Sequence, residues 1–188
     1  GRVSARLFGY MSVPYHERSV QMPKSRSETE SGAGQSLAHA VVQLMDPDTL
    51  FIIGPGTTTR SIMDELGLEG SLLGVDVVRG GALVASDVNE QGLLDLLRGE
   101  MAKIVVTPIG GQGYIFGRGN HQLSGRVIKA VGFNNILVVA TPTKLFGLRG
   151  APLLVDSDDD EVNRALEGYT RVITGMGQVI VYPIGWPQ

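Results

Sequence analysis

Short apolar runs that alternate with helix-like segments constrain the fold of this chain more than any other feature of the sequence. The runs at 50–53, 104–106 and 136–140 contain only apolar residues. Strands covered on both faces have such continuous runs, whereas strands with one wet face alternate apolar and polar residues. The pattern therefore predicts an α/β fold, with a mostly parallel sheet, helices on both of its faces and antiparallel edge strands at the two termini.

The segments between these runs suggest two regions. Helices are expected over 37–45, 57–66, 89–98 and 124–131, with a further helix start at 158–160. Additional strands are expected at 4–14, 18–21, 72–78, 82–85, 152–155, 170–174 and 179–182. The polar stretch 23–34 is typical of a loop. We therefore expect N-terminal strands and a flexible connection over 1–34, followed by an α/β nucleotide- or sugar-phosphate-binding domain over 35–188.

Charge and composition exclude several classes of function. The formal net charge is −3, which argues against a general nucleic-acid binder because such proteins present a basic face. The chain has no cysteine, so disulfides and thiolate metal sites are excluded. No apolar run approaches the roughly 20 residues that span a bilayer, and no signal peptide is recognisable. We expect a cytoplasmic protein without a membrane partner, and the missing initiator Met suggests a piece of a longer chain.

The first candidate site follows the apolar run at 50–53. Gly54 and Gly56 allow a tight turn, and Thr57, Thr58 and Thr59 come where a helix is expected to begin. Ligands in open α/β sheets bind outside the carboxyl ends of the strands, and a helix N-terminus attracts anions. The threonines are therefore candidates for phosphate or sugar contacts, although Thr57 or Thr58 would also serve as a simple helix cap.

The second candidate site is the glycine-dense segment 107–120. The candidate binding residues in it are Gly110, Gly111, Gln112, Gly113, Arg118, Gly119 and Asn120. Ordering so many glycines is entropically costly, which favours a loop that approaches a ligand closely. The Arg118 guanidinium suits a phosphate, and the amides of Gln112 and Asn120 suit a ribose or a base edge. The alternative is a tight hairpin with Arg118 in solvent.

The third candidate site follows the run at 136–140. Thr141 and Lys144 are placed to complete an anion pocket, but Lys144 is equally well explained as a solvated surface lysine. Three acids follow or end apolar runs: Asp76, Asp87 and Asp156. An acid in such a position is often functional or paired, so each is a candidate for binding a metal-phosphate or acting as a base.

The segment 106–120, with sequence VTPIGGQGYIFGRGN, resembles the signature of the ATP- or polyphosphate-dependent NAD kinase family. More narrowly, it is similar to the branch that includes the acetoin-catabolism X proteins. Further segments follow in that branch's order at 50–59, 74–76, 140–145, 152–156 and 168–175. The resemblance therefore covers nearly the whole chain.

This resemblance implies phosphate transfer from ATP or polyphosphate to the 2′-hydroxyl of the adenosine ribose of NAD, with a divalent metal, Mg²⁺ being the expected one. The family's Gly-Gly-Asp-Gly-Thr motif, which carries the catalytic aspartate, does not occur in the sequence. The resemblance thus implies the C-terminal portion of the enzyme, a nucleotide as its small-molecule partner and an N-terminal catalytic domain as its protein partner. A homo-oligomer is compatible with this interpretation.

A second resemblance concerns 53–59, 74–76 and the expected hairpin at 80–84, which are similar to the ribose-5-phosphate isomerase and sugar-phosphate-sensing repressor fold. It implies that the threonine loop holds a sugar phosphate. The isomerase's acidic cluster is not reproduced, because Asp76 is followed by Val77, Val78 and Arg79. The alternative functions are therefore a non-catalytic domain that senses a sugar phosphate or nucleotide and, as a third choice, a free-standing isomerase.

Overall fold

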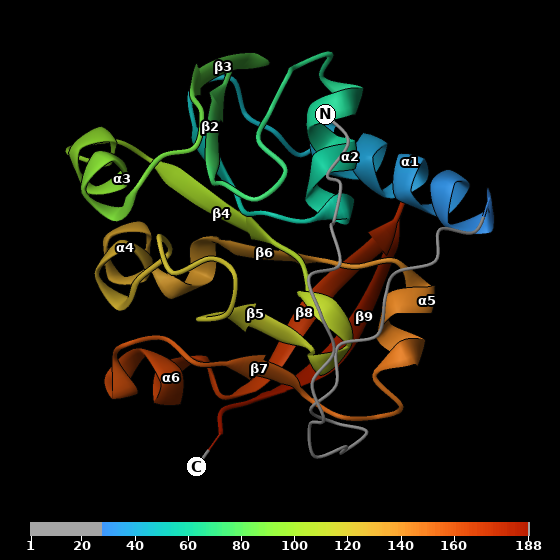
Figure 1. Ribbon diagram of the computed structural model, residues 1–188. Coiled ribbons are helices and arrows are strands. Elements are labelled where there is room, and N and C mark those ends of the chain that lie inside the picture. Colours follow the sequence, from blue (N-terminus) through green and yellow to red (C-terminus); the bar gives the residue numbers. More distant parts are fainter. Residues whose placement is uncertain (1–27, 188) are drawn as a thin grey trace, which may run out of the picture.

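The computed structural model describes residues 28–187, and within them nine strands form one sheet in the order β3-β2-β1-β4-β6-β8-β9-β7-β5 (Figure 1). The strands are β1 Leu50–Ile53, β2 Asp76–Arg79, β3 Ala82–Ala85, β4 Ala102–Val106, β5 Tyr114–Phe116, β6 Ile136–Val139, β7 Leu153–Val155, β8 Gly168–Gly175 and β9 Gln178–Gly185. The α-helices are α1 Glu28–Val42, α2 Thr57–Glu65, α3 Glu90–Leu96, α4 Gly125–Val131, α5 Pro142–Gly147 and α6 Asp160–Leu166, and two 3₁₀ turns are η1 Gly110–Gln112 and η2 Phe133–Asn135. The strands expected at 4–14 and 18–21 lie outside the described residues.

Two groups of strands run in opposite directions through this sheet. Strands β1, β4, β6 and β8 are mutually parallel, whereas β9 is antiparallel to β8, and β7 and β5 run with β9 (Figure 1). The carboxyl ends of the two groups therefore lie on opposite sides of the sheet. We use the name lysine edge for the row of strand ends at which β1, β4 and β6 lead into Gly54, Thr107 and Thr141. The arginine edge is the opposite row of strand ends, where β5 and β7 lead into Gly117 and Asp156.

Helices cover both faces of the parallel strands, as the continuous apolar runs predict. Leu37 of α1 and Ile62 of α2 share one buried cluster with Phe51. The neighbouring residue, Ile52, belongs to a second cluster with Leu93 of α3 and Val127 of α4. Successive side chains of a strand point to opposite faces. Strand β1 is thus buried along its whole length, and the predicted α/β class with a mostly parallel sheet is confirmed.

Several predicted turns and helix starts are confirmed in detail. The hairpin between β2 and β3 turns through Gly80 and Gly81, whose φ angles of 55° and 76° are both positive, as a tight two-residue turn requires. The Asn89 side chain caps α3, that of Ser124 caps α4 and that of Asp159 caps α6. Each cap accepts backbone N–H groups that the first turn of its helix leaves without partners.

The loop predicted over 23–34 is wrong from residue 28 onward, because α1 begins at Glu28. The expected division at residue 34 therefore falls inside a helix. Gly32 and Gly34 favoured the loop interpretation because glycine is a poor helix former. In the structure Gly34 is buried, and a Cβ there would lie 3.5 Å from the hydroxyl of Ser61 on α2. Packing of α1 on α2 thus outweighs the local preference.

The strand predicted over 72–78 begins only at Asp76. The prediction that Asp76 ends a strand is therefore wrong, since this residue starts β2. Leu72 and Leu73, which suggested the earlier start, are exposed. The chain before β2 folds back instead, because the backbone N–H and hydroxyl of Ser71 donate hydrogen bonds to the Asp76 carboxylate at 2.7 and 3.0 Å.

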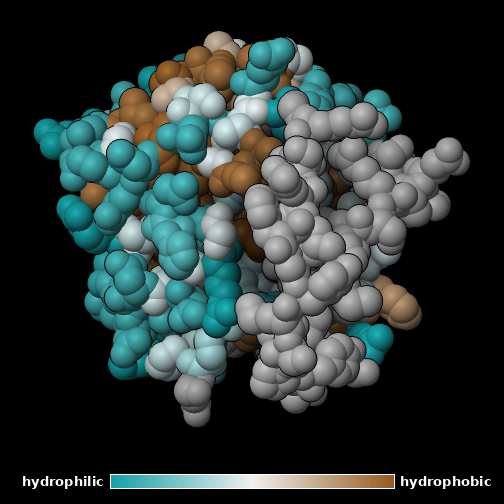
Figure 2. All heavy atoms as spheres, viewed as in Figure 1, coloured by the Kyte–Doolittle hydropathy of each residue, from teal (hydrophilic) through white to brown (hydrophobic). Residues whose placement is uncertain are grey.

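The C-terminal hairpin of β8 and β9 is antiparallel as expected, but its predicted place at a sheet edge is wrong. Strand β8 also pairs with β6, and β9 also pairs with β7, so the hairpin joins the two strand groups. The outermost strands of the described sheet are β3 and β5. Strand β3 exposes Leu83 and Val84, and apolar surface gathers over the β2–β3 hairpin at the top of Figure 2.

Candidate functional site

Lys144 connects three loops of the lysine edge. Its ammonium nitrogen Nζ donates hydrogen bonds to the hydroxyl oxygens of Thr58 at 3.0 Å and Thr107 at 2.9 Å. Thr58 lies in the first turn of α2 after β1, Thr107 directly follows β4, and Lys144 lies on α5 after β6. The parallel arrangement of these three neighbouring strands brings the loops together. All three segments predicted to form a site thus meet at Lys144, the second of them through Thr107 at its start.

The two threonines form the base of this site. The exposed fraction of Thr58 is 6% and that of Thr107 is 1%, so both hydroxyls are held in fixed places. A hydroxyl that accepts a hydrogen bond from an ammonium still carries its own proton for a second acceptor. The ends of β1, β4 and β6 therefore bring one cation and two hydroxyl groups together. Thr107 was not among the predicted binding residues, and its place after a buried strand was the available signal.

The N-terminus of α2 adds further donors at the same edge. The helix is preceded by Gly56, which has no side chain to cap it, so Thr57, Thr58 and Thr59 begin the helix without a side-chain acceptor. Backbone N–H groups at such an end carry partial positive charge. Gly56 has φ of 135°, and a Cβ there would lie 2.8 Å from the Thr107 methyl group. Glycine thus lets the first turn of α2 lie against the end of β4.

Other predicted residues of this edge have structural contacts. The hydroxyl of Thr59 is fully buried and donates to the carbonyl of Gly56 at 3.0 Å. Thr141 caps α5, and its hydroxyl accepts from the backbone N–H of Lys144 at 3.3 Å. Gly54 donates its N–H to the carbonyl of Val105 at 2.9 Å. Gly54, Thr59 and Thr141 therefore shape the loops, and their contact with a ligand stays a prediction.

Asp76 lies at the lysine edge, next to the end of β1, because its register partner is Ile53. The residue is 2% exposed. Besides the two bonds from Ser71, its carboxylate accepts a hydrogen bond from the hydroxyl of Ser86 at 2.7 Å and one from the backbone N–H of Asp87 at 3.0 Å. Four donors around a buried carboxylate explain Asp76 as the group that fastens the loops on either side of the β2–β3 hairpin.

The glycine-dense segment 107–120 does not form one loop. Tyr114–Phe116 is the buried strand β5, which pairs with β7, and it divides the segment in two. Gly110–Gln112 forms η1 at the lysine edge, and Gly113 follows with φ of 81°. The prediction of a single continuous loop is therefore wrong. The signal that was passed over is the run of one β-branched and two aromatic residues, which favours a strand.

Arg118, Gly119 and Asn120 lie at the arginine edge, beyond β5. The Arg118 guanidinium lies over the Tyr114 ring at 4.5 Å, and its Nε is 3.8 Å from a carboxylate oxygen of Asp156. Both contacts hold the Arg118 guanidinium against β5 and the end of β7.

Asn120 is 1% exposed, and both ends of its amide are used within the loop. Its Nδ2 donates to the carbonyl of Ile115 at 2.9 Å, and its Oδ1 accepts from the backbone N–H of Gly117 at 3.1 Å. Gly117 itself lies so close to β7 that an added Cβ would overlap the carbonyl of Asp156. Asn120 thus holds the turn after β5 in place, while Gly119 is exposed at the tip of that turn.

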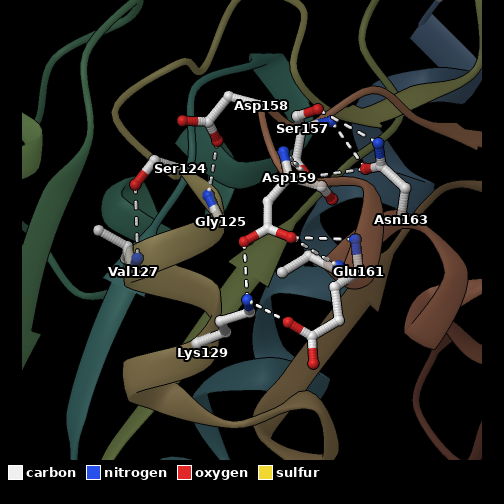
Figure 3. Close-up of polar contacts among 10 residues, drawn as sticks. Ser124, Gly125, Val127, Lys129, Ser157, Asp158, Asp159, Glu161 and Asn163 are labelled. Atoms are coloured by element: carbon white, nitrogen blue, oxygen red, sulfur yellow. Dashed lines mark hydrogen bonds and ion pairs between the residues drawn. The ribbon is translucent and has the colours of Figure 1, made fainter.

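A polar network joins α4 and α6 near the arginine edge (Figure 3). The Lys129 ammonium donates to the carboxylates of Asp159 at 2.8 Å and Glu161 at 2.6 Å, and Asp158 accepts from the backbone N–H of Gly125 at 2.9 Å. The hydrogen bond from Lys129, and then that from the backbone of Val162, lowers the pKa of the Asp159 carboxyl below its ordinary value of 3.8. The 158–160 run begins α6 as expected, and its acids also pair with Lys129 and with the start of α4, which was not predicted.

The residues of the lysine edge do not fit a divalent metal. Between residues 28 and 187, no group of three or more His, Cys, Asp or Glu side chains is placed to hold one. Lys144 places a positive charge between the two threonine hydroxyls, and such a charge repels a cation. Hard divalent cations bind clusters of oxygen ligands that include carboxylates. The expected metal therefore stays a prediction.

The family model described as the ATP-NAD kinase C-terminal domain matches residues 47–184, about three quarters of the chain. The chain belongs to this family. The matched part of this ATP-NAD kinase C-terminal domain runs from just before β1 into β9, so it includes both edges of the sheet. No curated protein and no solved structure gives a significant match.

No helix within 28–187 is long and apolar enough to cross a membrane.

Proposed function

We propose that this domain binds the phosphate of a nucleotide at the lysine edge and thereby serves an enzyme that transfers phosphate from ATP or polyphosphate to NAD. The observation that carries the proposal is the meeting of Lys144, Thr58 and Thr107 beside the N-terminus of α2. Convergent donors at a helix N-terminus form a site for anions. Family membership supports an NAD kinase-like function for such a site.

The proposed transfer replaces one P–O bond with another. The 2′-hydroxyl oxygen of the NAD adenosine ribose forms a bond to the terminal phosphorus of the donor, and the bond from that phosphorus to its bridging oxygen breaks. The hydroxyl proton passes to a base outside this domain. The rest of the donor, which is one phosphate shorter, leaves with the electrons of the broken bond. The donors of the lysine edge would hold a phosphate in place during this step, because fixed positive groups stabilise the charge on its oxygens.

Finer assignments also belong to this proposal. The order of the segments 50–59, 106–120 and 140–145 supports a place in the acetoin-catabolism branch. The antiparallel β2–β3 hairpin beside β1, with the threonine loop after β1, supports a likeness to the ribose-5-phosphate isomerase fold. Mg²⁺, polyphosphate and a cytoplasmic location are proposed on the family resemblance alone.

The test is NADP formation by the full-length protein, with ATP or polyphosphate as donor and NAD as acceptor. Lys144→Met removes the ammonium and keeps a side chain of similar length. We expect a rate at least tenfold lower, because a hydrogen bond to a charged group contributes about 1.5–3 kcal/mol. Arg98→Met is the matched control, because Arg98 is exposed and pairs with Asp95 of α3 on the surface. Equal rates for both variants would remove Lys144 from the site.

A sugar-phosphate or nucleotide sensor is the second candidate function. It is favoured by the composition of the lysine edge, where hydroxyl and ammonium donors can bind an anion without any group that performs chemistry. A thermal-shift screen of the chain separates the two functions, since a ligand stabilises the folded state that binds it. Stabilisation by ATP supports the kinase, whereas stabilisation by pentose or hexose phosphates alone supports the sensor.

A further inference from the structure

We draw no further inference here: the strongest candidate, the exposed apolar face of the β8–β9 hairpin with Tyr169, Val179 and Val181, carries none, because nothing in the structure of residues 28–187 shows what covers it.

Discussion

The Lys144 ammonium lies 2.9 Å from the Thr107 hydroxyl, although 37 residues separate them in the chain. The contact exists because β4 and β6 are parallel neighbours that end at the same edge of the sheet. A third loop joins them through Thr58, whose strand β1 is the other neighbour of β4. Any change that moves one of these strand ends should therefore alter the site as a whole.

Gly56→Ala should weaken the site by moving α2. The alanine Cβ would lie 2.8 Å from the Thr107 methyl group, and φ of 135° is a conformation that alanine rarely adopts. We expect a loss of about 1–3 kcal/mol in the free energy of unfolding, together with weaker phosphate binding. Urea unfolding and phosphate titration measure the two effects.

Gly67→Ala is the control for this substitution. Gly67 follows the same helix with φ of 69°, but no atom lies within 4 Å of its added Cβ. Backbone strain alone should lower its stability and leave phosphate binding as it is. Equal binding losses in the two variants would show that the contact with Thr107 does not matter.

Gly117→Ala should be strongly destabilising. The new Cβ would overlap the backbone carbonyl of Asp156, and φ of 89° already disfavours alanine. The atoms that the new Cβ would meet are backbone atoms, so no flexible side chain can move aside. We expect a loss of about 3 kcal/mol in the free energy of unfolding, at the upper end for an overpacked site. The comparison is Gly147→Ala at the end of α5, where nothing lies within 4 Å. A wild-type denaturation midpoint for Gly117→Ala would contradict the geometry of the β5–β7 pair.

Asp76→Asn should destabilise the β2–β3 hairpin. The carboxylate accepts hydrogen bonds from Ser71, Ser86 and the backbone of Asp87, and an amide would turn an NH₂ group toward one of these donors. We expect about 2–3 kcal/mol of lost stability. Asp64→Asn removes an exposed carboxylate paired with Arg60 and should change stability by roughly 0.5 kcal/mol or less. Similar losses in both variants would contradict a fastening role for Asp76.

The contact between Lys129 and Asp159 should give stability a specific dependence on acid. The hydrogen bond from Lys129 lowers the pKa of Asp159 below 3.8 in the folded state, so the charged carboxylate stabilises the fold above that pH. The contribution is lost as the pH falls through the lowered pKa, because the folded carboxyl then takes up a proton. The stability difference between the parent chain and Asp159→Asn should therefore be constant near neutral pH and shrink below about pH 3.8.

Urea unfolding at a series of pH values between 6 and about 2.5 tests this expectation. Asp160→Asn serves as the control, because it removes a carboxylate from the same helix turn without touching Lys129. A stability difference that stays constant down to the lowest pH would show that Asp159 gains nothing from its lysine.

Much of the local structure could be predicted because it depends on neighbours in sequence. The Gly80-Gly81 turn, the cap at Asn89, the helix start near Ser124 and the buried strand β1 all follow from short patterns. The start of α1 and the start of β2 could not be predicted in the same way. Gly34 becomes helical through packing against α2, and Asp76 holds the preceding chain through Ser71. Both are contacts between elements.

The candidate site was predicted in part. Thr58 and Lys144 were proposed as anion-binding residues, and the structure places them in contact. Thr107 was missed, and Arg118 follows β5, which runs opposite to the strands that lead into Thr58, Thr107 and Lys144. Sequence order shows that a loop follows a strand, but it does not show in which direction that strand runs.

The sequence by itself determined the α/β class, the covered parallel strands, most helix starts and the family resemblance, because these depend on periodicity and on residues a few positions apart. Only the tertiary structure decided which loops share an edge. The reversal between β8 and β9 turns β7 and β5 against β1, β4 and β6, so the loop with Arg118 follows a strand that runs opposite to the one before Lys144. Strand direction is a property of long-range pairing, and it is that pairing which places Lys144 beside Thr58 and Thr107.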